Sequence, residues 1–198
     1  MGRIFLILLF ITGSMSTNAQ SNKEVAILGA GCFWCVEAVF EELNGVISVE
    51  SGYMGGHVEN PSYKEICTGT TGHAEVAKVT FDPTIVTFSE VLEVFWKTHD
   101  PTTLNRQGAD VGTQYRSAIF YQSPEQQETA TYYKKKLTES GAYSSPIVTE
   151  IVVSSIYYPA EDYHQNYYAL NASQGYCQYV IQPKLEKFRK VFADKLKK

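Results

Sequence analysis

The sequence has few of the features that mark several protein classes. Its 198 residues include only four cysteines, too few for a small fold built on disulfides. Charged residues make up 19% of the chain and hydrophobic residues 44%, which excludes a disordered protein. Lys and Arg total 17 against 21 Asp and Glu, and this acidic balance disfavours nucleic-acid binding. The length is that of one domain with a core of its own.

An unbroken apolar run near the N-terminus is too short to cross a membrane as a stable helix. Arg3 precedes this run, residues 4–11, and a polar stretch follows that ends in Thr17-Asn18-Ala19. This order is typical of a secretory signal peptide. We therefore expect residues 1–19 to be a signal peptide and the protein to be exported to the periplasm or another extracytoplasmic, oxidising compartment. An uncleaved N-terminal anchor is the alternative.

Apolar periodicity predicts a regular succession of strands and helices in the rest of the chain. The predicted strands are 25–29, 46–53, 75–82 and 117–121. The predicted helices run from 32 to Gly45 and over 88–96. The resulting order, strand-helix-strand-strand-helix-strand, is that of the split βαβ or ferredoxin-like unit. Two long loops, 54–73 and 100–115, interrupt it.

The second half of the chain adds a helix, a strand and a C-terminal helix. Ser123 as N-cap and Pro124 in the first turn begin a helix that ends before Gly141. Residues 147–153 are predicted to be a strand, and a tyrosine-rich segment without clear period follows. We therefore expect one α+β domain over residues 20–198, a two-layer sandwich with a ferredoxin-like split βαβ core, long loops and a C-terminal helix.

The C-terminal helix is expected over about 183–197 and is basic. Residues 184–198 contain seven Lys and Arg against two acidic residues, whereas the rest of the mature chain is strongly acidic. We interpret this as a solvated face that packs against an acidic body. A membrane-surface helix is the alternative, although membrane contact is not expected. The residues predicted to face inward are Leu185, Phe188, Val191, Phe192 and Leu196.

The segment Gly31-Cys32-Phe33-Trp34-Cys35 joins a predicted strand to a helix N-terminus. Free N–H groups and the positive end of the helix dipole at such a position favour a thiolate, so Cys32 is placed where a nucleophile could be activated. Cys35 lies one helical turn later and could form a disulfide with Cys32. From spacing alone, a pair of buried small residues or a structural disulfide remains a real alternative.

Further blocks follow this segment in a fixed order. They are Val36-Glu37, 52–56, 60–63, Cys67, 72–75, 95–101, 106–117 and 160–165. Together with Gly31-Cys32-Phe33-Trp34, these blocks resemble the A-type peptide methionine sulfoxide reductases. Several independent motifs in register over about residues 25–177 make the resemblance specific.

The resemblance implies that Cys32 attacks the sulfur of methionine-S-sulfoxide, whether protein-bound or free. Glu75 matches the family's acid, which must have a raised pKa if it is to donate a proton at neutral pH. Tyr63 and Tyr115 match the phenols that hydrogen-bond the sulfoxide oxygen, and Asp110 matches a further polar residue of that pocket.

The resemblance also implies how the substrate methyl group is held and how Cys32 is regenerated. Phe33 and Trp34 match the apolar wall that receives the methyl group. Cys32 then becomes a sulfenic acid that condenses with a second thiol. Cys177 matches the resolving cysteine of many members and is the preferred candidate on resemblance, whereas Cys35 offers a closer partner and remains a candidate. A relay through both is the third alternative. Cys67 matches a non-catalytic position and is expected to be buried.

The sequence predicts an enzyme without a bound cofactor or metal, reduced by an external dithiol such as thioredoxin or a thioredoxin-like protein. Cys67 and Cys177 form no second C-x-x-C pair, so a zinc site that adds His73 is not expected. We expect a monomer. Two rival functions remain: a thioredoxin-like dithiol-disulfide oxidoreductase that uses Cys32 and Cys35, and a secreted binding module with two structural disulfides.

Overall fold

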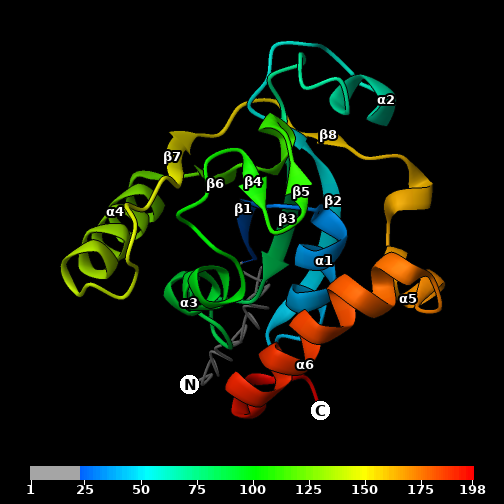
Figure 1. Cartoon of the computed structure of the whole chain (residues 1–198). Coiled ribbons are helices and arrows are strands. Elements are labelled where there is room, and N and C mark those ends of the chain that lie inside the picture. Colours follow the sequence, from blue (N-terminus) through cyan, green and yellow to red (C-terminus); the bar gives the residue numbers. More distant parts are fainter. Residues whose placement is uncertain (1–22) are drawn as a thin grey trace, which may run out of the picture.

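The structure, a computed structural model, describes residues 23–198 (Figure 1). The expected signal peptide therefore lies outside the described residues. The strands are β1 (Glu24–Ala30), β2 (Val46–Met54), β3 (Ala74–Phe81), β4 (Arg106–Gln107), β5 (Asp110–Val111), β6 (Ser117–Tyr121), β7 (Glu150–Val153) and β8 (Tyr158–Pro159). The helices are α1 (Phe33–Glu41), α2 (Tyr63–Ile66), α3 (Phe88–Thr98), α4 (Pro124–Glu139), α5 (Tyr167–Asn171) and α6 (Gln182–Val191), with a π-helical turn at Cys177–Ile181.

The fold is mixed α and β around one six-stranded sheet with the strand order β7-β6-β1-β3-β2-β8. Neighbouring strands are antiparallel except β6 and β7, which are parallel. β4 and β5 form a separate two-stranded hairpin. The strands predicted near 25, 46, 75 and 117 are all present, and the strand predicted over 147–153 is shorter, because pairing with β6 begins only at Glu150.

The main hydrophobic core lies between the sheet and the helices α1, α3 and α6. In Figure 1, α1 and α3 lie in front of the sheet and α6 runs beside α1. Side chains of a strand alternate between its two faces, so Ala77, Val79 and Phe81 of β3 join this core. Val76 of the same strand joins a smaller cluster on the opposite face, with Phe120 of β6. The same parity places Glu75 on the helix side of the sheet.

The C-terminal segment differs in part from the prediction. α6 ends at Val191, and Val191 is 50% exposed rather than inward, because the chain leaves helical geometry at Phe192 and turns through Ala193–Lys195. Leu185, Phe188 and Phe192 are buried as predicted. Within residues 23–198, no helix has both the length and the apolar character needed to span a membrane.

The basic side chains of this segment pair with acidic residues of the body. Arg189 Nε lies 2.8 Å from Glu42 Oε2. Lys195 Nζ lies 3.2 Å from carboxylate oxygens of both Glu90 and Glu93 on α3. These contacts agree with a basic helix that packs on an acidic surface.

Candidate active site

Cys32 lies at the junction between β1 and α1. Gly31, which precedes it, has φ +89°, and a Cβ at this position would lie 2.5 Å from Gln107 Cβ, so the turn requires glycine. Cys32 occupies the N-cap position of α1 and makes no side-chain capping bond. Its side chain is therefore free for chemistry at the positive end of the helix.

Burial outweighs the helix terminus in setting the state of Cys32. The residue is only 7% exposed. Burial raises the pKa of the Cys32 thiol well above its ordinary value, and a hydrogen bond with Cys35 and the charge of Glu75 act in the same direction. In the protein without substrate, burial therefore favours the thiol form of Cys32 and acts against the helix terminus.

Glu75 is a buried carboxyl group directly beside the first turn of α1. It lies on β3 opposite Tyr53 of β2 and is 1% exposed. Its Oε2 atom accepts the backbone N–H of Phe33 at 3.1 Å. Burial raises the pKa of Glu75 to about 8, although the Phe33 N–H opposes the rise. Glu75 is therefore largely protonated at neutral pH and available as a proton donor.

The predicted phenols surround this carboxyl group. Tyr63 is the first residue of α2, and its N–H donates to Glu161 Oε1 at 2.8 Å. Tyr115 ends a short 3-10 turn, Thr113–Tyr115. Burial raises the pKa of both phenols, and the nearby charge of Glu75 adds to the rise. Both side chains are therefore hydrogen-bond donors over the whole physiological pH range.

Aromatic rings line one side of Cys32. Phe33 is buried, and its ring stacks on that of Tyr63 with the centroids 6.5 Å apart. Trp34 is half-buried and stacks on Tyr167 of α5 with the centroids 3.6 Å apart and the planes 6° apart. The Trp34 indole N–H donates to His164 Nδ1 at 3.1 Å. The two predicted wall residues thus belong to one packed aromatic cluster.

A second thiol lies beside the first. The first turn of α1 places Cys35 one turn after Cys32, and the Cys35 N–H donates to the Cys32 carbonyl at 3.1 Å. A hydrogen bond from the Cys32 thiol is the main cause that lowers the pKa of Cys35, to about 7. The ionisation of Cys35 is therefore linked to that of Cys32 through the hydrogen bond between the two thiols.

Tyr176 covers both thiols. Its hydroxyl lies 3.9 Å from Cys35 Sγ and donates to Asp110 Oδ2 at 2.7 Å. Asp110 belongs to β5, so this bond ties the hairpin to the C-terminal segment. Cys177, the next residue, is fully buried at the start of the π-helical turn.

All four cysteines are free in the structure. Cys67 is exposed, so the expectation that it is buried is wrong: α2 lies on a loop that carries only Ile66 into the core. Burial raises the pKa of Cys177, and the charge of Cys35 adds to this effect. The structure thus gathers Cys32, Cys35 and Cys177 in one region, whereas Cys67 lies at the exposed end of α2 beside Tyr63.

Comparison with known proteins gives the family that the sequence motifs resemble. The family model "Peptide methionine sulfoxide reductase" matches residues 24–196. The chain belongs to this family. A peptide methionine sulfoxide reductase MsrA of Deinococcus radiodurans is 53% identical over 186 residues, which cover 94% of this chain and 90% of the relative. The activity that follows from this membership is reduction of methionine sulfoxide.

Solved structures of this family are similar to the fold. Methionine sulfoxide reductase A of Corynebacterium diphtheriae is 40% identical, with a TM-score of 0.70 over 81% of this chain and 80% of that chain. Mxr1 from Saccharomyces cerevisiae in reduced form is 32% identical, with a TM-score of 0.71 over 78% of this chain and 89% of that chain. Mxr1 is also known in complex with Trx2.

In this methionine sulfoxide reductase, several residues that hold the site together were not singled out from the sequence. Glu161 accepts the Tyr53 hydroxyl at 2.9 Å as well as the Tyr63 N–H, and so joins β2 to α2. Glu37 of α1 is buried and accepts the N–H groups of Asn166 and Tyr167 at 3.0 and 3.3 Å. Both glutamates lie within motif blocks of the family, which was the only available signal.

No metal cluster accompanies this site in the reductase. Across residues 23–198, no three His, Cys, Asp or Glu side chains are grouped so that they could bind a metal ion. The groups that are present are two adjacent thiols, one protonated carboxyl and two phenols. Such a set can supply a nucleophile, a proton and hydrogen bonds to a departing oxygen.

Proposed function

We propose that this protein reduces the S epimer of methionine sulfoxide, protein-bound or free, by direct attack of Cys32 on the sulfoxide sulfur. The observation that carries the proposal is the Glu75 carboxyl, which accepts the N–H of Phe33 directly after Cys32 and whose pKa is raised to about 8. In this step the sulfoxide oxygen passes to Cys32, so that methionine and a Cys32 sulfenic acid form. The sulfoxide is reduced and the thiol is oxidised by the same two electrons.

The surrounding groups have separate roles in this proposal. Glu75 donates a proton to the sulfoxide oxygen as its bond to sulfur breaks. The hydroxyls of Tyr63 and Tyr115 hydrogen-bond that oxygen, and Asp110 orients the polar side of the site through Tyr176. Phe33 and Trp34 form the apolar wall for the methyl group.

We further propose that Cys35 is the first thiol to condense with the Cys32 sulfenic acid. It is one helical turn away, and its pKa of about 7 keeps part of it as thiolate at neutral pH. Cys177 is buried and has a raised pKa, so it suits a second exchange step after the tail around Tyr176 has moved.

An external dithiol, thioredoxin or a thioredoxin-like protein, is proposed to reduce the resulting disulfide. The complex of yeast Mxr1 with Trx2 supports such a partner. We also propose that residues 1–19 direct export, in which case the reductant would have to be extracytoplasmic. Fractionation of cells that express the full chain, followed by N-terminal sequencing, tests this: recovery of the uncleaved chain in the cytoplasm would contradict it.

We propose that residues 20–198 form a single domain whose core is the ferredoxin-like split βαβ unit. The observed neighbours β6-β1-β3-β2, all antiparallel, support this description, since β1 and β2 then flank β3 and are joined by α1. β7 and β8 would extend this core at its two edges.

The activity is tested with purified protein, dithiothreitol and each epimer of a chromophore-labelled methionine sulfoxide. The S form should be reduced, the R form should not, and Cys32→Ser should abolish turnover. Activity that survives in Cys32→Ser would overturn the proposal. Reduction of insulin disulfides without any sulfoxide reduction would instead favour the thioredoxin-like dithiol function.

The resolving thiol is tested with Cys35→Ser and Cys177→Ser. Both variants should still release about one methionine per enzyme in a single turnover, because the first step needs only Cys32. Turnover with a thioredoxin-type donor should fall strongly in Cys35→Ser. Full turnover in Cys35→Ser together with loss in Cys177→Ser would contradict the assignment of Cys35.

A further inference from the structure

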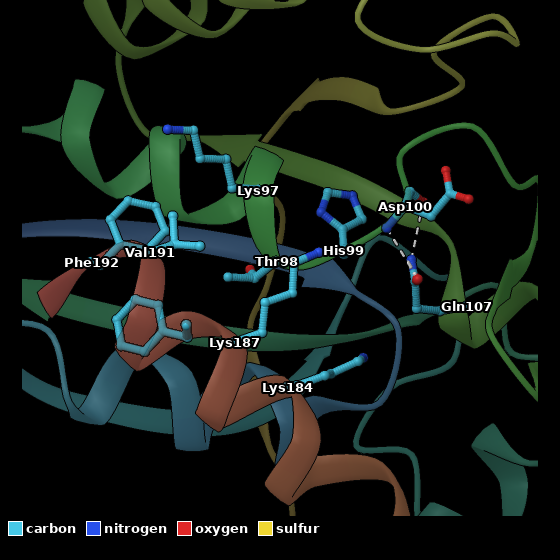
Figure 2. A pocket seen from close by; sticks show the side chains of 10 residues that line it. Lys97, Thr98, His99, Asp100, Gln107, Lys184, Lys187, Val191 and Phe192 are labelled. Carbon is cyan, nitrogen blue, oxygen red and sulfur yellow. Dashed lines mark hydrogen bonds between the residues drawn. The ribbon is translucent and has the colours of Figure 1, made fainter.

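Cys35 of α1 and Lys184 of α6 line the same narrow crevice. With a volume of about 10 Å³, the crevice is too small to hold a ligand between them. It is a continuation of a wider cavity of about 280 Å³, because Thr98, His99 and Lys184 line both. Figure 2 shows Lys184 and Lys187 extending from successive turns of α6 into the wider cavity. Only Lys184 also reaches the crevice.

Two other cations of the C-terminal segment have ionic partners, whereas Lys184 differs from them. Arg189 and Lys195 form ion pairs with carboxylates of the body. Lys184 makes no ion pair within residues 23–198, although it is partly buried. The apolar side chains Val36 and Val39 also line the crevice, so Lys184 and Cys35 share partly apolar surroundings. A charge acts more strongly across such a region than across solvent.

We propose that Lys184 is a positioning residue for the resolving step, in which its ammonium group holds Cys35 as the thiolate that attacks oxidised Cys32. The proposal rests on the proposed function and deepens it. In this step the Cys35 thiolate attacks the sulfur of the Cys32 sulfenic acid. The S–S bond forms, the S–O bond breaks, and the leaving hydroxide takes a proton to become water. Cys32 is reduced and Cys35 is oxidised.

Within residues 23–198, Lys184 is the one cation among the groups that line this crevice or shift the pKa of Cys35. The charged and titratable groups that act on Cys35 or share its crevice are Cys32, Glu75, His99, Asp110, Tyr176, Cys177 and Lys184. His99 is neutral because its burial lowers its pKa to about 4. The Cys32 thiol, the tyrosine and Lys184 lower the pKa of Cys35, whereas burial and Asp110 raise it.

Oxidation of Cys32 changes this balance in favour of Lys184. In the reduced protein, the hydrogen bond from the Cys32 thiol is the largest cause that favours the Cys35 thiolate. A sulfenic acid no longer has that thiol proton. At the moment when Cys35 must attack, Lys184 is therefore the cation that remains to stabilise it among the described residues of the crevice.

The test compares Lys184→Met and Lys184→Arg with the control Lys187→Met in the full chain. Three measurements are made. The first is the single-turnover release of methionine from a peptide sulfoxide. The second is the rate of Cys32–Cys35 disulfide formation between pH 5.5 and 9, from quenched mass spectrometry. A third measurement follows the pH dependence of iodoacetamide alkylation in a Cys32→Ser, Cys67→Ser, Cys177→Ser background, where Cys35 is the only thiol.

Methionine release should be unchanged in all three variants. Disulfide formation at pH 7 should fall about three- to tenfold in Lys184→Met, its pH profile should move to higher pH, and Lys184→Arg should restore both. Lys187→Met should behave as wild type. Equal profiles for Lys184→Met and wild type, or an equal shift in Lys187→Met, would overturn the proposal. Absence of methionine release from the wild type would instead contradict the proposed function, while the alkylation profile still reports on Lys184.

Discussion

The Oε2 atom of Glu75 accepts the backbone N–H of Phe33 at 3.1 Å, so the acid on β3 is fixed to the residue that follows Cys32. The bond uses one of the free N–H groups at the start of α1. It therefore fixes the position of the Glu75 carboxyl relative to Cys32, independently of the conformation of the surrounding loops.

Glu75→Gln should slow methionine release about 100-fold or more, because the side chain then has no acidic proton to give. In the wild type, the single-turnover rate should fall as the pH rises above about 8, since Glu75 loses its proton there. Rapid-quench measurements from pH 6 to 10 check both points. A falling alkaline limb that persists unchanged in Glu75→Gln would show that another group is responsible.

Glu37 and Glu75 should make the fold less stable as the pH rises from about 4.5 to about 8. Burial raises the pKa of Glu37 to about 7 and that of Glu75 to about 8, so the native state binds more protons than the unfolded state in this range. Urea unfolding at pH 5, 6, 7 and 8 measures this slope. In Glu37→Gln, the loss of unfolding free energy over this pH range should be about 1–2 kcal/mol smaller than in the wild type. An unchanged loss would contradict the raised pKa of Glu37.

Gly31→Ala should destabilise the protein by about 3 kcal/mol, because φ is +89° and the new Cβ would meet Gln107 at 2.5 Å. Gly108→Ala is the matched control. Its φ is +62°, but nothing lies within 4 Å of its Cβ position, so the expected cost is about 1 kcal/mol. Denaturant unfolding of both variants measures the difference. Equal losses would mean that the close approach to Gln107 is not what requires glycine.

Tyr176→Phe should slow disulfide formation about three- to tenfold at pH 7. The hydroxyl contacts Cys35 Sγ and lowers the pKa of that thiol, and the variant also loses the bond to Asp110. Tyr179→Phe serves as the control, since Tyr179 is 82% exposed. The same quenched mass spectrometry used for Lys184 provides the rates, and identical rates for the two variants would contradict a role for the Tyr176 hydroxyl.

Cys67 should be the first cysteine to react with a bulky maleimide in the native, reduced protein. It is exposed, whereas Cys32, Cys35 and Cys177 are buried. Peptide mapping after short labelling times identifies the modified residue. Cys67→Ser should remain active, and a tenfold loss of turnover in this variant would give Cys67 a role that its position does not suggest.

Much of the central sheet and of the site could be predicted because each depends on local signals. Side chains alternate along β3, so Ala77, Val79 and Phe81 lie on one face of the sheet. Glu75, two residues before Ala77, lies on the same face and is thereby positioned under α1. The strand-to-helix turn at Gly31 put Cys32 at a helix N-terminus. Motif matches supplied Tyr63 and Tyr115, which no periodicity distinguishes from the other tyrosines.

The parts that could not be predicted depend on contacts between distant segments. Tyr176 meets Asp110 and Cys35 only because the π-helical turn packs against α1, and a segment without period gives no sign of this. The burial of Cys32, which raises the pKa of its thiol, could not be predicted because spacing does not report burial. Val191 was misplaced because helical spacing continues through it although the helix ends there.

The cover that Tyr176 forms over the reactive thiols has a kinetic consequence. Cys32 and Cys35 are both buried, and Tyr176, whose hydroxyl contacts Cys35, immediately precedes Cys177 in the C-terminal tail. A sulfoxide and a protein dithiol would both have to displace the same tail, so they cannot occupy the enzyme together. Initial-rate plots at several reductant concentrations should therefore be parallel lines, the pattern of a ping-pong mechanism in which the enzyme alternates between a reduced and a disulfide form.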